Sequence, residues 1–248
     1  MPEAQLPSSS ASVSDLMDAA TRIFRSTLAK CLPVSMFATL LIMLPNMYLL
    51  TTGHQLNPLH PPQDPKFWTL YLLGVLGYLL LAAVLMLRQR AMLLGHAPQL
   101  QAEFAAAFAR WPLLILSSVL AGIVAMAGLM LLVLPGIYLL VCFLLLVPVA
   151  LFETHTPWQL LMRCIRLMQP LWRKAFAAAV IATLIVFVCV VAASAAFQIL
   201  QFGLSAAGVK PAAISAFAQA CGLGIQAVAL VYFSALWLVF YSAASSSA

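Results

Sequence analysis

Residues 134–175 read LPGIYLLVCFLLLVPVALFETHTPWQLLMRCIRLMQPLWRKA, and this stretch sets the pattern of the whole chain. Near its start, Pro135 and Gly136 form a pair that predicts a turn, because proline does not continue a helix. Residues 137–152 carry no charge. As a helix they would be about 24 Å long, at roughly 1.5 Å per residue, beside a bilayer core of roughly 30 Å. The sequence therefore predicts a short membrane span with its turn in the interface and a kink near Pro148.

An amphipathic helix is predicted directly after this span, over residues 157–169. Thr156 is a good N-cap and Pro157 suits the first helical position, while Gln159 completes a capping box. Apolar residues then recur at spacings of three and four, with Arg163 and Arg166 on the opposite side. This pattern is typical of a helix that lies in the membrane surface, with arginine near the lipid phosphates.

Taken together, these features resemble the YciC-like family of bacterial inner-membrane proteins. The shared features are the LPGIYLL turn, the span with its late proline, the acidic residue Glu153 and the basic amphipathic helix. They are also similar to the membrane domain that is fused to some glycerophosphodiester phosphodiesterases. The resemblance is strongest over residues 134–174, and the general layout fits from about Val13 to Tyr241. It implies a fold and a location in the bacterial inner (cytoplasmic) membrane, and no phosphodiesterase chemistry, because these 248 residues hold no such soluble domain.

The composition also places the chain in lipid. Hydrophobic residues make up 65% of the 248 residues and charged residues only 7%, whereas a soluble domain carries about 25% charged residues. We therefore predict an all-α membrane protein with a single six-span domain over residues 12–241, between a disordered tail (1–11) and a polar tail (242–248). The predicted spans are 32–50, 67–87, 112–134, 137–152, 175–200 and 214–241. The predicted interfacial helices are 13–28, 98–110 and 157–169.

Two short motifs suggest that this layout is repeated. Residues 44–50 read LPNMYLL and residues 134–140 read LPGIYLL. Each motif lies near the same end of an odd-numbered span. The predicted unit is a cytoplasmic amphipathic helix followed by a membrane hairpin, and three such units in parallel orientation predict a six-helix bundle with a cytoplasmic collar.

The positions of Lys and Arg predict the orientation. Of the twelve such residues, all but Lys66 and Lys210 fall on the side that holds both termini, which places both termini in the cytoplasm. The basic residues are interleaved with apolar ones at helical spacing, so anionic lipid headgroups are the expected partner rather than nucleic acid. The residues of this predicted basic collar are Arg22, Arg25, Arg163, Arg166, Arg173 and Lys174.

The interiors of the predicted spans contain amides and hydroxyls but no charged side chain. This pattern argues against a proton- or sodium-coupled pump that uses buried carboxylates. Such polar groups usually form hydrogen bonds between helices. A polar cleft is the alternative, and its candidate residues are Asn46, Gln198, Gln219 and Gln226.

No metal, cofactor or catalytic site is predicted. His54 and His60, with Asp64, match the spacing of no standard metal site. The motifs of serine hydrolases, zinc peptidases and P-loop enzymes are absent from the sequence. Only an enclosed pocket that paired Glu153 with His155 and a second acid would favour an enzyme.

The expected function is a non-enzymatic role in envelope organisation, as a scaffold or partner of other membrane proteins. The alternative is a carrier or binder of a lipid or small amphipathic molecule. A cavity lined by the cleft candidates would favour the carrier. A filled bundle with contacts at small residues, such as Gly122 and Gly224, would favour the scaffold.

Overall fold

The computed structural model describes residues 11–52, 62, 64–153, 156–206 and 211–246, without the side chains of 50, 200–206 and 211–218. Within these residues the protein is all-helical and has no strand, as predicted. The helices are α1 (Val13–Thr52), α2 (Pro65–Leu93), α3 (Leu100–Leu131), α4 (Val133–Phe143), α5 (Leu146–Phe152), α6 (Pro157–Met168), α7 (Trp172–Ala206) and α8 (Pro211–Ser245).

Six helical segments of the described chain are long and apolar enough to cross a membrane. This result confirms the predicted multi-pass membrane protein. The segments are Val13–Leu49, Pro65–Leu93, Leu100–Leu131, Val133–Phe152, Trp172–Ile199 and Gln219–Ser245.

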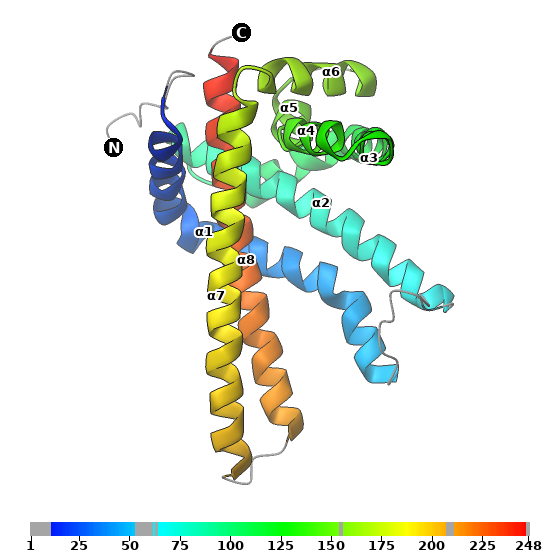
Figure 1. The fold of residues 1–248 in the computed structure, drawn as a ribbon, viewed down its shortest axis with the longest axis vertical. Coiled ribbons are helices and arrows are strands. Elements are labelled where there is room, and N and C mark those ends of the chain that lie inside the picture. Colours follow the sequence, from blue (N-terminus) through cyan, green and yellow to red (C-terminus); the bar gives the residue numbers. More distant parts are fainter. Residues whose placement is uncertain (1–10, 53–61, 63, 154–155, 207–210, 247–248) are drawn as a thin grey trace.

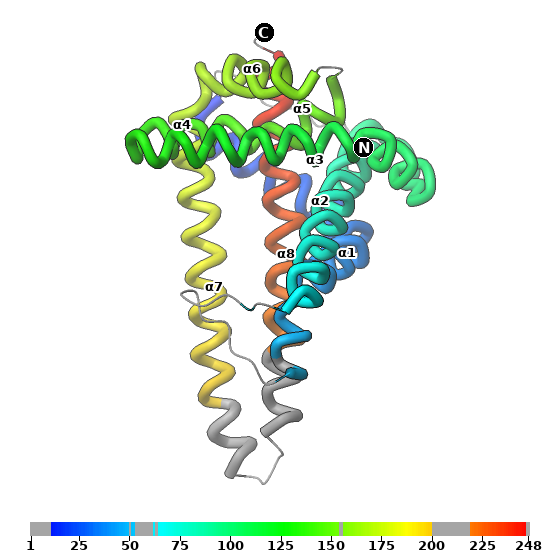
Figure 2. Tube along the Cα trace, turned by 90° about the vertical axis from the view of Figure 1, so that its right-hand side faces the viewer, coloured from blue at the N-terminus to red at the C-terminus, as the bar shows by residue number. Residues whose placement is uncertain are grey.

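The helices pair into three hairpins, α1–α2, α3–α4 with α5, and α7–α8, that diverge from a shared core (Figure 1). The first turn of α1 and the last turn of α8 lie at the same end of the molecule, beside α6. The α3–α4 hairpin lies across α7 and α8 rather than alongside them (Figure 2). The hairpins share a core only near one end, and the predicted repetition of one unit three times in parallel orientation stays a prediction.

The shared core consists of aliphatic side chains from helices that are far apart in the sequence. Leu16 of α1, Val84 of α2, Leu160 of α6 and Val239 of α8 are all fully buried in one cluster. Burying a leucine or valine side chain contributes about 1.5–3 kcal/mol. The stability of the fold is thus concentrated at the end where the termini and α6 meet.

Two of the predicted interfacial helices are not separate elements. Residues 13–28 continue into the rest of α1, and residues 98–110 fall within or just before α3. Pro33 and Pro112 lie inside these helices. A proline removes one backbone hydrogen bond and kinks a helix without always ending it, and α1 is bent along its length (Figure 1).

The turn of the α3–α4 hairpin lies earlier than predicted. Leu132 is extended and separates α3 from α4, so Pro135 and Gly136 lie in the first turn of α4. Proline is tolerated there because the first amides of a helix have no helical acceptor. A Cβ on Gly136 would come within 2.6 Å of the Leu129 backbone nitrogen, so the glycine permits the close approach of the two helices.

The predicted span 137–152 is interrupted by a short non-helical step at Leu144 and Leu145. Pro148 follows four residues after Leu144, and its ring denies the Leu144 carbonyl a helical hydrogen bond. The proline therefore accounts for the break between α4 and α5.

The remaining differences concern helix ends. Helix α2 continues past Arg88 to Leu93, and α8 extends to Ser245, into the predicted polar tail. The predicted helix 157–169 is present as α6, and the Thr156 amide donates to Gln159 Oε1 at 3.2 Å within the predicted capping box. The predicted disordered tail lies outside the described residues, apart from Ala11.

Candidate binding pocket and basic surface

A pocket of about 280 Å³ lies between α1 and α8. We call it the α1–α8 pocket. Three of the four residues predicted to form a polar cleft line it, namely Asn46, Gln219 and Gln226. The described residues that line it are Met43, Asn46, Met47, Gln219, Gly222, Leu223 and Gln226.

Helical spacing brings these residues onto two facing surfaces. On α1, Met43, Asn46 and Met47 lie three and four residues apart and so share one side of the helix. On α8, Gln219 and Gln226 are separated by two helical turns, with Gly222 between them. The extensive packing of α1 on α8 then brings the two surfaces together.

The pocket combines an apolar wall with three side-chain amides. Within the described residues, none of these amides has a strong hydrogen-bond partner. Asn46 Nδ2 lies 3.6 Å from the sulfur of Met43, which is a weak acceptor. Within the described part of the chain, the Gln219 and Gln226 side chains form no hydrogen bond. An amide surrounded by hydrocarbon without a partner costs several kcal/mol. The three amides are therefore groups that a bound molecule with hydroxyl or carbonyl groups would satisfy.

The fourth predicted cleft residue, Gln198, is not part of this pocket. It lies on α7, where its side chain is exposed. In the predicted spans, Asn46, Gln198 and Gln219 all lie near the end away from the termini. The packing shows that α8 forms the pocket with α1 and that Gln198 of α7 is not among the lining residues.

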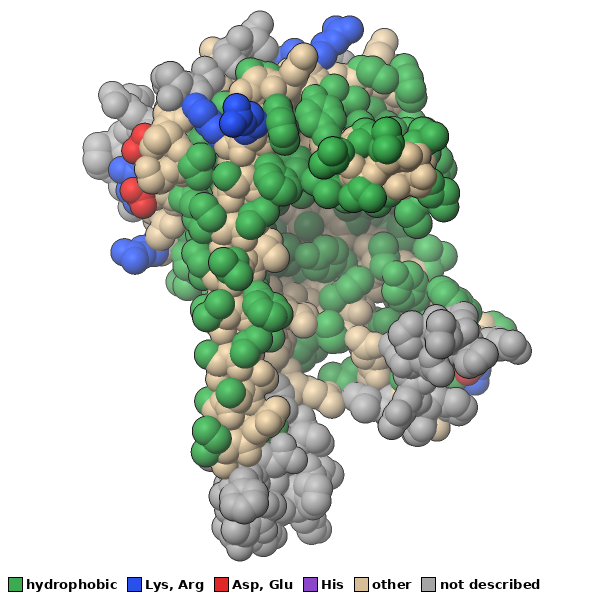
Figure 3. Space-filling view, in the orientation of Figure 1, with side chains coloured by type: hydrophobic (Ala, Val, Ile, Leu, Met, Phe, Trp, Pro, Cys, Tyr) green, Lys and Arg blue, Asp and Glu red, His purple; other side chains and the backbone are tan. Residues whose placement is uncertain are grey.

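The predicted collar residues lie at the end of the molecule that holds the termini. Figure 3 shows most of the visible Lys and Arg side chains in the upper part of this view, a further one at the lower right, and none among the described residues of the α7–α8 arm. Arg22, Arg25, Arg166 and Arg173 are exposed, and Lys174 donates to the carbonyl of Ala11 at 2.8 Å. The α6 surface also carries a depression of about 400 Å³, lined by Trp158, Gln159, Met162, Arg163 and Arg166.

Glu153 connects several helices at this end, a role that its position after a predicted span did not indicate. Its carboxylate accepts hydrogen bonds from Arg163 Nε at 3.0 Å and from the Tyr241 hydroxyl at 3.3 Å, and its carbonyl accepts from Arg110 at 3.0 Å. Glu153 thereby joins α3, α6 and α8. His155, its expected neighbour in an enzymatic site, lies outside the described residues.

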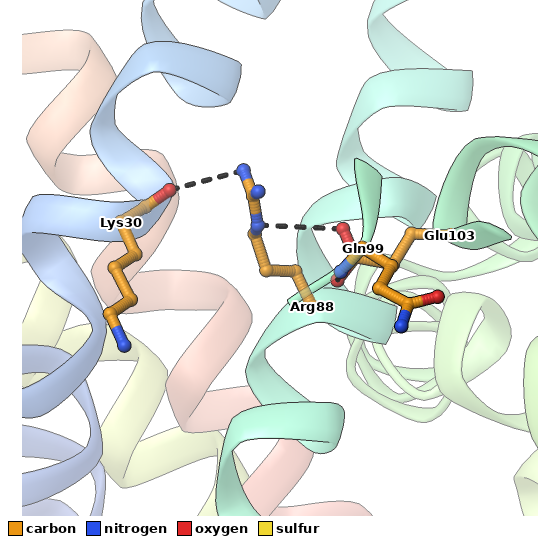
Figure 4. Close-up of polar contacts among 4 residues, drawn as sticks. All are labelled: Lys30, Arg88, Gln99 and Glu103. Atoms are coloured by element: carbon orange, nitrogen blue, oxygen red, sulfur yellow. Dashed lines mark hydrogen bonds and ion pairs between the residues drawn. The ribbon is translucent and has the colours of Figure 1, made fainter. Parts of the chain in front are cut away.

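A second polar cluster, the α2–α3 junction, joins three helices at the same end (Figure 4). Arg88 Nε lies 3.4 Å from Glu103 Oε2, and Arg88 also donates to the carbonyl of Lys30 at 3.1 Å. The side chains of Arg88 and Glu103 are only 13% and 7% exposed. The other Glu103 oxygen accepts from the Gln99 amide at 3.1 Å. Arg88, which directly follows the predicted span 67–87, therefore links α1, α2 and α3.

Gln89, next to Arg88, is fully buried and donates to the Val231 carbonyl of α8 at 3.0 Å. The α2–α3 junction and this hydrogen bond together connect α1, α2, α3 and α8, which belong to the three hairpins.

The cysteines of the chain are all free, and none of the described residues forms a cluster suited to a metal ion. Cys164 of α6 is buried, and this burial raises the pKa of its thiol to about 12. A thiol of this kind stays protonated at neutral pH and is a poor nucleophile.

No protein-family model, curated protein or solved structure matches this chain.

Proposed function

We propose that this chain is a non-enzymatic protein of the bacterial inner membrane that binds a lipid or small amphipathic molecule in the α1–α8 pocket. The observation that supports the proposal is the convergence of Asn46, Gln219 and Gln226 on one cavity. Asn46 is 173 and 180 residues away from Gln219 and Gln226 in the sequence, and the other described lining residues are apolar. This combination suits a ligand with an aliphatic body and a polar group.

The small-residue contacts expected of a scaffold give less support to that role. A Cβ added to Gly122 or Gly224 would meet no atom within 4 Å. These glycines therefore do not bring helices into close contact within the chain. The close approaches occur instead at Gly74, Gly128 and Gly136.

The proposed topology has both termini in the cytoplasm. The basic end of the molecule then faces the cytoplasmic leaflet, where each Lys or Arg near an anionic surface contributes about 1 kcal/mol of attraction. The depression on α6, with Trp158, Arg163 and Arg166, is the part of the predicted basic collar best shaped for a headgroup. The inner-membrane location and the YciC-like relationship rest on the resemblance in residues 134–174.

A pair of glycine substitutions on α8 tests the proposal. Gly222 lines the pocket, and Gly224 on the same helix does not, while a Cβ at either position meets no neighbour. A leucine at Gly222 would fill the pocket, and a leucine at Gly224 is the matched control. We expect native mass spectrometry of the purified protein to show a bound lipid in the wild type and in Gly224→Leu, but not in Gly222→Leu. Equal lipid content in both variants would contradict the proposal.

A scaffold role is the second candidate, and the exposure of α7 favours it. In an apolar stretch of 18 residues within Trp172–Ile199 of α7, only 17% of the residues are buried. Leu184, Phe187 and Val188 are more than half exposed. Photo-crosslinking from these positions in native membranes would capture a specific protein partner if α7 is a docking surface, and only lipid if it is not.

A further inference from the structure

We infer that the head of the ligand in the α1–α8 pocket is uncharged and bears hydroxyl or carbonyl groups, as in an acylglycerol, and that phosphate-bearing lipids are excluded. This inference rests on the proposed function and adds the chemical class of the ligand. It follows from the residues of the lining, from the size of the pocket and from a contrast with the depression on α6.

Among the described residues, the lining contains amides as its strongest polar groups and no ionisable side chain. An amide both donates and accepts, so Asn46, Gln219 and Gln226 can pair with a hydroxyl or an ester carbonyl. A phosphate in the same place would lie in a mostly apolar cavity without a cation. Burial of an unpaired ion costs far more than burial of a hydrogen-bonded neutral group.

The molecule carries a separate surface suited to anions. The depression on α6 contains Arg163 and Arg166 beside Trp158, the residue types that favour a phosphate at the membrane interface. Charged and uncharged lipids would thus meet different ends of the protein, and the difference in lining residues provides the selectivity.

The size of the α1–α8 pocket favours a ligand with one chain. Its volume of about 280 Å³ lies at the lower limit of ordinary ligand pockets, which are about 300–1,000 Å³. Met43 and Met47 are unbranched and adapt to a flexible aliphatic chain. Gly222 leaves open space on α8, because a Cβ there would contact nothing within 4 Å.

Two probes with the same acyl chain test the inference, a monoacylglycerol and the corresponding lysophosphatidic acid. Binding of each to the detergent-solubilised full-length protein is measured for the wild type, Gly222→Leu and Gly224→Leu. We expect the monoacylglycerol to bind at least tenfold more tightly than the lysophosphatidic acid. We also expect Gly222→Leu, and not Gly224→Leu, to weaken monoacylglycerol binding at least tenfold.

The outcomes separate the inference from the proposed function. Equal or tighter binding of the lysophosphatidic acid, weakened by Gly222→Leu, would overturn the uncharged head and leave the pocket as a binding site. Binding of both probes that is the same in Gly222→Leu and Gly224→Leu, or no binding of either, would overturn the pocket itself. The double variant Gln219→Leu/Gln226→Leu should weaken monoacylglycerol binding about tenfold, and unchanged binding would overturn the role of the two amides in holding the head.

Discussion

The α2–α3 junction and the α1–α8 pocket both place polar side chains inside a very apolar protein, yet they differ in how those groups are satisfied. At the junction, Arg88 Nε and Glu103 Oε2 form an ion pair at 3.4 Å without a hydrogen bond, while other atoms of the two side chains bond to backbone groups of Lys30 and Gln99. In the pocket, Gln219 and Gln226 have no hydrogen-bond partner within the described chain. The presence or absence of an internal partner therefore separates groups that hold the fold from groups that are available to a ligand.

This difference has opposite consequences for substitution. Removal of one member of a buried pair leaves the other without a partner, so the fold loses stability. Replacement of an unpartnered amide by an apolar side chain removes a group whose desolvation is already unfavourable, so the fold keeps its stability and only binding is lost.

The largest effect is expected at the junction. Glu103→Leu leaves the buried Arg88 guanidinium without its counter-ion, and loss of one partner of a buried ion pair costs about 3–5 kcal/mol. We expect a large fall in the thermal unfolding midpoint of the detergent-solubilised protein. In the double variant Arg88→Leu/Glu103→Leu much of that stability should return. A single variant no less stable than the double one would show that the pair does not hold the helices.

A smaller loss is expected where α1 contacts α2 through a glycine. A Cβ on Gly74 would lie 2.6 Å from the Leu41 carbonyl oxygen, a backbone atom that cannot move alone. Gly74→Ala should therefore cost about 1–3 kcal/mol and, by displacing α1 near Met43, also weaken ligand binding. Gly122→Ala is the control, because its Cβ would meet nothing within 4 Å. Equal unfolding midpoints for the two variants would contradict the close α1–α2 contact.

The pocket amides should respond in the opposite way. In Gln219→Leu/Gln226→Leu we expect an unchanged or higher unfolding midpoint without ligand. Binding of the lipid that the wild type retains should weaken about tenfold, since a hydrogen bond contributes about 0.5–1.5 kcal/mol. Thermal unfolding with and without added lipid measures both quantities. A fall in ligand-free stability like that of Glu103→Leu would assign the amides to the fold instead.

The smallest effect concerns the cover that α6 forms over the shared core. Thr156→Ala removes the N-cap of α6 at a cost of about 1 kcal/mol. Because burial raises the pKa of Cys164 to about 12, its thiol should resist alkylation at pH 8 until α6 lifts away. The variant should raise the alkylation rate of Cys164 about fivefold, as followed by peptide mass spectrometry. Alkylation of buried Cys31 should not change, and a parallel rise there would indicate general loosening rather than movement of α6.

Local signals predicted the elements of this fold better than their arrangement. Helix α6 is present where Thr156, Pro157 and Gln159 predicted its start, because a capping box depends on neighbouring residues alone. Uninterrupted apolar runs likewise predicted six helices able to span a membrane, a result that depends on composition and length.

Features that depend on packing were harder to predict. The hairpin turn lies at Leu132 and not at Pro135, because the first turn of a helix accepts proline. The Arg88–Glu103 pair was missed, since its members are on different helices and each alone resembles an interfacial charge. For the pocket, helical spacing could place Gln219 and Gln226 on one side of α8. It could not show that Asn46 of α1 lies opposite them, or that Gln198 of α7 is not part of the lining.

Photo-crosslinking with a diazirine-bearing monoacylglycerol tests the central claim most directly. The probe is added to membranes that contain the wild-type protein, and the modified peptides are mapped by mass spectrometry. We predict adducts concentrated within residues 43–47 and 219–226, which an excess of unlabelled monoacylglycerol removes. Adducts spread over the exposed faces of α3 and α7, and unaffected by the competitor, would contradict a specific site between α1 and α8.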